Sequence, residues 1–255
     1  MTLSLDWLPA VAFTYLMLFM RIGAMLMLMP ALGEQTIPMR MRLGFALAFT
    51  IVVYPLLSSV MPAVPPDLAG IVGLIFHELA VGLIIGAIIR ITVMATSVAG
   101  TIIAFQVGLS GALAADPTQA GVQGAVFSSF LSFLGITLIF ATDLHHMALA
   151  AIYESYMVFS PTDPVMFEDA MQLAIRAVAG AFSVGVQMSA PFIVFGLVFN
   201  LGAGILARLM PQLQVYFVLM PANIIVGLLL FAILLTMMMG WYVTSFENHL
   251  AMWRG

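Results

Sequence analysis

Long apolar runs separated by short, turn-rich segments are the main pattern of the chain. A membrane-spanning helix needs about 20 predominantly apolar residues, and the runs reach or approach that length. The segments between them are rich in proline, glycine and acidic residues, which favour turns. The pattern predicts an all-α, polytopic membrane protein built from long helical hairpins. The expected runs are residues 9–29, 43–60, 68–109, 125–156, 173–199 and 215–242.

Composition excludes several functional classes. Of the 255 residues, 64% are hydrophobic and 7% are charged, whereas soluble domains have about 25% charged residues. The formal net charge is −4 without a basic cluster, which argues against binding to nucleic acid or to anionic lipid surfaces. The chain has no cysteine and therefore no disulfide framework. The segment before the first run lacks the basic region of a signal peptide, so we expect it to be retained.

The third run is too long for a simple membrane crossing. As one helix, Leu68–Leu109 would measure roughly 63 Å at about 1.5 Å per residue, whereas the hydrocarbon core is about 30 Å thick. A split at Arg90 would restore ordinary lengths but would reverse every later loop. Without that split, the positive-inside rule places Arg40, Arg42 and Arg208 in the cytoplasm. A helix this long and apolar is best explained if much of it contacts other protein.

An unusual segment, Gln106–Gly124, follows the third run. It consists mainly of glycine, alanine and small polar residues, with one Asp-Pro step and no lysine or arginine. Proline fixes φ and glycine tolerates positive φ, so both favour irregular backbone. Because an ordinary solvated loop carries charges, we expect this irregular backbone to be shielded by protein.

Ionisable residues inside the apolar runs are costly unless they are paired or face protein. The simplest interpretation is an ion pair between Glu78 and either Arg21 or Arg90, which would join two helices. A proton path and a metal site are the alternatives. The polar residues expected to be buried and to support assembly are Arg21, His77, Glu78, Arg90 and Arg208.

Small residues at helical spacing indicate close helix packing. Gly82 and Gly86 form a GxxxG pair, Ser128 and Ser132 form a second small pair, and Gly196 lies in the fifth run. Such faces let helix backbones approach one another within a membrane. The sequence does not say whether the partner helix belongs to this chain or to another.

A serine motif, GxSG at residues 108–111, suggests nucleophilic catalysis. In rhomboid-type intramembrane proteases such a serine pairs with a histidine of a later helix, and His145 and His146 lie on the next run. That family surrounds its histidine with small residues, whereas Met147 follows here. We therefore expect no catalytic residues.

The metal-binding patterns are also incomplete. His77 and Glu78 begin an HExxH zinc motif, but the second histidine is absent. Asp143, His145 and His146 are close in sequence, yet the spacing i, i+2, i+3 on a helix places their side chains on different faces. The sequence therefore predicts no metal site and no cofactor.

Four motifs in register along the chain resemble one protein family. They are Ile37–Gly44, Phe76–Gly82, Gln106–Ser110 with Asp116-Pro117, and Pro211–Phe217 with Met220-Pro221. In this order and spacing the sequence resembles the FliR family of flagellar export proteins, which is related to the SctT proteins of type III secretion injectisomes. The resemblance covers essentially the whole chain.

The resemblance implies partners, a location and a division of the chain. FliR-type proteins join FliP and FliQ in a helical export gate, with FlhB and FlhA as further partners and unfolded proteins as substrates. The location would be the bacterial inner membrane, at the flagellar basal body. By analogy, residues 1–165 would be FliP-like and residues 170–255 a FliQ-like helical hairpin. Gly82, Gly86 and Gly196 would then pack against FliP and FliQ.

The resemblance also assigns a role to the central segment. In this family a loop projects into the closed pore as a plug, which here would be residues 106–122. The expected plug residues are Gln106, Gly108, Leu109, Ser110, Gly111, Asp116, Pro117 and Gly121, with Gly108, Gly111 and Gly121 as hinges. The sequence thus predicts a non-enzymatic subunit that lines and closes an export channel. The alternatives are an ion- or proton-coupled transporter and, less favoured, a rhomboid-like protease.

Overall fold

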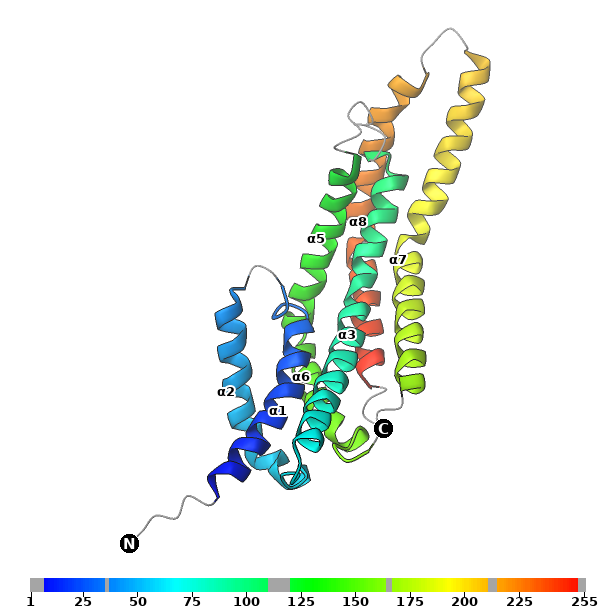
Figure 1. Cartoon of the computed structure of the whole chain (residues 1–255). Helices are drawn as coiled ribbons and strands as arrows, with labels where there is room; N and C mark the ends of the chain where they lie inside the picture. Colours follow the sequence, from blue (N-terminus) through cyan, green and yellow to red (C-terminus); the bar gives the residue numbers. More distant parts are fainter. Residues whose placement is uncertain (1–6, 35–36, 110–119, 164–166, 211–214, 252–255) are drawn as a thin grey trace. The chain divides into compact units, whose positions relative to one another are not determined.

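The computed structural model describes residues 7–34, 37–109, 120–163, 167–210 and 215–251. All the regular elements in these ranges are helices (Figure 1), which confirms the predicted all-α class. They are α1 (Leu8–Leu28), α2 (Met39–Leu57), the short 3-10 helix η1 (Ser58–Val60), α3 (Leu68–Gln106), α5 (Ala120–Ala141), α6 (Leu144–Val158), α7 (Phe167–Leu209) and α8 (Val215–Ala251).

Five of these helices are long and apolar enough to cross a membrane, and a sixth crossing is added if the bent pair α5–α6 counts as one span. The polytopic membrane class is thereby confirmed. The helix α3 has 39 residues and is about 58 Å long at about 1.5 Å per residue, so the third run is one helix without a split at Arg90. Its length exceeds the hydrocarbon core of about 30 Å.

The helix α7 is longer than the sequence predicts. It extends over 43 residues, Phe167–Leu209, although residues 200–214 were expected to be a connection. Glycine costs only about 1 kcal/mol inside a helix, so Gly202 and Gly204 do not end it. Because a proline disfavours helical backbone at the preceding residue, the helix stops before Met210 and Pro211. Glu168 and Asp169 lie in its first turn, where negative charge favours a helix N-terminus.

The fourth apolar run is broken, so the prediction of one helix over residues 125–156 is wrong. The helices α5 and α6 meet at a bend of 78°. Asp143 lies at the break with φ 59° and ψ 11°, in the left-handed region. Aspartate reaches this region more easily than most residues because its short side chain can form local hydrogen bonds. The helix α5 also begins at Ala120, so residues 120–124 are helical and not irregular as expected.

The chain forms two compact units, which are described separately. Unit 1 comprises residues 1–91, 143–178 and 249–255. In this unit α2 lies beside α1 (Figure 1), and the hydroxyl of Tyr15 donates to the carbonyl of Leu47 at 3.0 Å. Its core includes fully buried apolar side chains of α1, α3 and α6, namely Leu18, Ile22, Met25, Ile85 and Ile152.

Unit 2 comprises residues 92–142 and 179–248. Phe231 of α8 lies at its centre, with ring centroids 5.0 Å from Phe127 of α5 and 6.2 Å from Phe192 of α7. Large aromatic side chains in such contacts contribute much of the packing energy of a core. The two units follow contacts within the chain and leave the expected division at residues 165–170 a prediction.

Candidate functional site

A buried ion pair between Arg21 of α1 and Glu78 of α3 lies in the core of unit 1. Nε and Nη2 of Arg21 donate to the two carboxylate oxygens of Glu78, each at 2.8 Å. The side chains are 0% and 1% exposed. This two-pronged geometry is the strongest form of an arginine–carboxylate interaction, and it is one of the two pairings that the sequence suggested.

The same guanidinium group also holds the end of α6. Nη1 of Arg21 donates to the carbonyl oxygens of Ser155 at 3.0 Å and Phe159 at 2.9 Å. These carbonyls lie at the C-terminus of α6, where helices have unpaired acceptors and a partial negative charge. The guanidinium carbon lies 4.1 Å from the ring centroid of Tyr156, which adds a cation–π contact. Arg21 therefore joins α1, α3 and α6.

The other polar residues predicted for assembly have different surroundings. Arg90 pairs with Glu34, 3.4 Å away, and not with Glu78; both side chains are about 40% exposed, so this pair is weak. Nδ1 of His77 lies 3.5 Å from Glu78. Arg208 is exposed in the chain near the end of α7, so the burial of Arg90 and Arg208 in an assembly stays a prediction.

The GxxxG pair of α3 packs inside the chain. A Cβ atom at Gly82 would lie 2.5 Å from the carbonyl oxygen of Arg21, and one at Gly86 would lie 3.1 Å from Cα of Met25. The backbone of α1 therefore lies against these two glycines, so the helix that the GxxxG pair contacts here belongs to this chain. The close approach positions Arg21 against Glu78.

The C-terminus of α3 is anchored in unit 2, at the start of the central segment. The Gly108 N–H donates to the carbonyl of Phe105 at 3.1 Å, and its φ of +80° is a conformation that favours glycine. This is the geometry of a common helix end, in which a left-handed glycine follows the last turn. The sequence thus ends α3 at a defined position.

Two other helices hold this end of α3. Gly196 of α7 lies against the side chain of Gln106, and a Cβ there would overlap the Gln106 amide oxygen. A Cβ at Gly227 of α8 would lie 2.5 Å from Cγ1 of Val107, which is fully buried. Gly196 thus contacts α3 within the chain, and packing of the surrounding helix surface against another subunit stays a prediction.

Asn223 of α8 was not singled out from the sequence. A Cβ at Gly108 would lie 2.7 Å from its Nδ2 atom. The residue is 9% exposed, and its Oδ1 atom has no hydrogen-bond partner among the described residues. The sequence does contain a signal for this residue, namely an amide side chain within a long apolar helix. Buried polar groups normally have hydrogen-bond partners, so an amide at such a position indicates a contact.

The remaining residues expected in the plug are described only in part. Leu109 follows Gly108 and is partly exposed, and the backbone of Gly121 lies in the first turn of α5. Ser110, Gly111, Asp116 and Pro117 lie outside the described residues.

Gly108→Ala is expected to destabilise the protein. An alanine pays about 1–2 kcal/mol for a left-handed conformation, and its methyl group would also displace the amide of Asn223. Gly204→Ala is the matched control, because a Cβ there would meet no described heavy atom within 4 Å and alanine favours a helix by about 0.5–1 kcal/mol. Thermal unfolding in detergent should show a lower midpoint for the first variant only. Equal midpoints would show that neither the conformation of Gly108 nor its contact with Asn223 affects stability.

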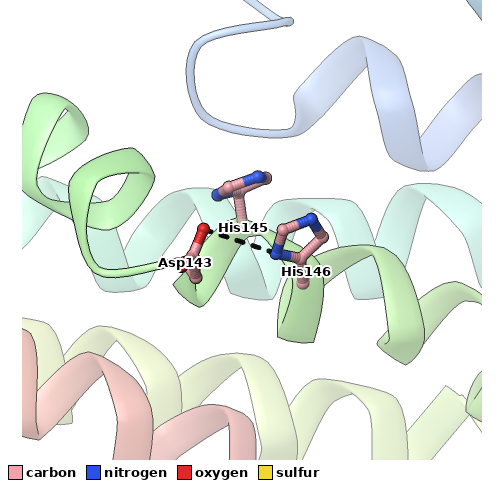
Figure 2. A group of neighbouring side chains, drawn as sticks. All are labelled: Asp143, His145 and His146. Atoms are coloured by element: carbon pink, nitrogen blue, oxygen red, sulfur yellow. Dashed lines mark ion pairs between the residues drawn. The ribbon is translucent and has the colours of Figure 1, made fainter.

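The break between α5 and α6 also changes the interpretation of Asp143, His145 and His146. One ligand atom from each side chain lies within 4.8 Å of the others (Figure 2). The prediction that they face apart assumed one continuous helix. Because Asp143 precedes α6 in a left-handed conformation, its carboxylate turns toward the two rings.

The comparisons with known proteins identify the family. The family described as "Bacterial export proteins, family 1" matches residues 12–249. The chain is 45% identical over 220 residues to the flagellar biosynthetic protein FliR of Caulobacter vibrioides, with 86% of this chain and 87% of that protein covered. It is 30% identical to FliR of Bacillus subtilis, covering 89% and 86%, and 25% identical to the Yop proteins translocation protein T of Yersinia pestis, covering 89% and 87%. The chain therefore belongs to the FliR family of bacterial export proteins and is a multi-pass membrane component of a type III export apparatus.

Proposed function

We propose that this chain lines and closes the channel of the export gate, and that residues 106–122 form its plug. The supporting observation is the anchored end of α3, where Gln106, Val107 and Gly108, the first residues of the central segment, are held by α7 and α8. A segment that closes a pore needs a fixed base if it is to return to the same position after each passage. Gly108, at the end of that base, permits the large backbone rotations that hinges use.

The partners of this gate are FliP and FliQ, with FlhB and FlhA alongside, in the bacterial inner membrane. The helices α7 and α8 support this assignment. In their most apolar 18-residue stretches, only 17% and 11% of the residues are buried within the chain. They have 43 and 37 residues and are therefore about 64 and 56 Å long. Lipid tails cover about 30 Å, so other subunits are needed to cover the rest of this apolar surface.

The arrangement of Glu78 supports gating over proton-coupled transport. A proton carrier needs a carboxylate with an oxygen free to take up and give up a proton. Both oxygens of Glu78 instead accept N–H groups from Arg21. The group therefore serves to join helices. The serine of the protease alternative, Ser110, lies outside the described residues.

Deletion of Leu109–Thr118 tests the plug. Cells that carry the variant are expected to leak small solutes, measured as entry of a membrane-impermeant dye or as loss of membrane potential. Co-purification with FliP and FliQ should be unchanged, because the deleted residues lie beyond the anchored end of α3.

Deletion of residues 211–214 is the matched control. These residues connect α7 to α8, so the variant also shortens a connection between two long helices but leaves residues 106–122 intact. A leak with the central deletion and none with the control supports the plug. An assembled but tight central deletion, or an equal leak in both variants, contradicts it.

A further inference from the structure

The break between α5 and α6 brings together Asp143, His145 and His146, three side chains that can bind metal. Nδ1 of His146 lies 3.7 Å from Oδ1 of Asp143. The imidazole rings of the two histidines are 4.0 Å apart between centroids, with an angle of 35° between their planes (Figure 2). A ligand atom from each of the three residues lies within 4.8 Å of the others.

These separations are close to those of a metal site. In a tetrahedral zinc site, bonds of about 2.0–2.1 Å place neighbouring ligand atoms about 3.3 Å apart. The Asp143–His146 separation is already near that value, and rotation about side-chain bonds covers the remaining difference. The side chains of Asp143 and His146 are 80% and 69% exposed, so they are free to rotate and a metal ion has access.

We propose that Asp143, His145 and His146 bind one divalent transition-metal ion of the zinc class. Two imidazoles and one carboxylate suit zinc and its first-row neighbours better than magnesium or calcium, which prefer oxygen ligands. Three protein ligands leave a coordination position for water or for a group from a neighbouring subunit. This site is independent of the proposed plug.

The ion would restrain the backbone at the start of α6. Thr142 and Asp143 lie between α5 and α6, and Asp143 is in the left-handed region. A metal that joins the carboxylate of Asp143 to two side chains of the first turn of α6 restrains this residue.

Zinc binding by the full chain tests the proposal. The protein is purified in detergent with an affinity tag that contains no histidine, treated with a chelator and dialysed. Titration with Zn²⁺ against a fluorescent zinc indicator should show one equivalent bound per chain. His146→Ala and Asp143→Asn should each raise the dissociation constant for Zn²⁺ at least tenfold. Even a change in a residue that only hydrogen-bonds to a metal ligand lowers metal affinity about 10–100-fold.

The two variants and one control separate coordination from folding. Asparagine tolerates left-handed backbone as aspartate does, so Asp143→Asn removes the charged ligand and keeps the bend. His249→Ala removes a histidine outside the cluster and should leave the dissociation constant unchanged. All variants should elute at the same volume in size-exclusion chromatography.

Cobalt gives a second readout. Co²⁺ in place of Zn²⁺ should produce visible d–d absorption whose intensity and shape report nitrogen-containing, low-coordinate geometry, and this absorption should be lost in His146→Ala. The proposal is overturned if the wild-type chain binds less than one equivalent, or if His146→Ala and Asp143→Asn bind Zn²⁺ as tightly as His249→Ala does.

Discussion

Arg21→Met is expected to lower the free energy of unfolding by about 3–5 kcal/mol, the usual cost of removing one partner from a buried ion pair. The change leaves the carboxylate of Glu78 at 1% exposure without its charge partner. It also removes the donors to the carbonyls of Ser155 and Phe159 and the cation–π contact with Tyr156. Methionine has a similar length and is apolar, so the loss of charge and hydrogen bonds is the main effect.

A double-mutant cycle isolates the interaction. Glu78→Met should also destabilise the chain, because it leaves the buried guanidinium of Arg21 without a counter-charge. The double variant Arg21→Met/Glu78→Met should lose less than the two single variants together, since replacement of a whole buried pair by apolar groups is often tolerated.

Thermal unfolding of the purified chain in detergent measures these effects. At about 2–4 °C per kcal/mol for a chain of this size, Arg21→Met should lower the midpoint by roughly 6–20 °C. Additive losses in the double variant would contradict a direct interaction. A midpoint within a degree or two of the wild type for either single variant would show that the pair does not hold unit 1 together.

Gly100→Ala and Gly73→Ala are expected to have opposite effects, although both change a glycine of α3. A Cβ at Gly100 would lie 2.6 Å from the backbone N and Cα of Ser128 in α5, so the two helices would have to separate. At Gly73 a Cβ would meet no described heavy atom within 4 Å. There alanine should stabilise the helix by about 0.5–1 kcal/mol.

The separation of α3 and α5 would also break hydrogen bonds. Ser128 donates to the carbonyl of Ser97 at 3.0 Å and bonds with Thr101 at 2.8 Å, and Ser97 bonds with Ser132 at 2.8 Å. Overpacking typically costs about 1–3 kcal/mol, and hydrogen bonds between membrane helices add about 0.6 kcal/mol each. Gly100→Ala should therefore be among the most damaging single-methyl changes in unit 2.

The measurement compares unfolding midpoints of the isolated chain in detergent, where no other subunit can contact Gly73. The midpoint should fall for Gly100→Ala and rise slightly for Gly73→Ala. A rise for both variants would show that α3 and α5 do not approach as closely as Gly100 and Ser128 indicate.

The helices were predictable because apolar length is a local property of the sequence. Each predicted run of hydrophobic residues is helical, although the fourth forms two helices, and the structure decides that α3 is continuous at Arg90, which the sequence left open. The errors lie where a single residue decides the backbone. Asp143 breaks the fourth run although neither proline nor glycine marks the position, while Gly202 and Gly204 remain helical within α7.

The site was predictable in its residue types but not in its pairings. The cost of a charge in an apolar run indicated that Arg21 and Glu78 need partners, but Arg90 was an equal candidate for Glu78 until the structure paired it with Glu34. Asn223 and Tyr156 were not singled out from the sequence. Their roles depend on contacts with Gly108 and Arg21, which lie 115 and 135 positions away along the chain.

The sequence by itself determined the membrane class, the apolar runs that form the helices and, through motifs in register, the family. These follow from composition and order along the chain, which burial of apolar surface and helix geometry convert directly into elements. Only the tertiary structure decided that α1 covers Gly82 and Gly86, that α7 and α8 hold the end of α3, and that the three side chains at the α5–α6 break converge. Such contacts join residues distant in sequence or depend on one backbone angle, and the hydrophobic pattern along a chain contains neither kind of information.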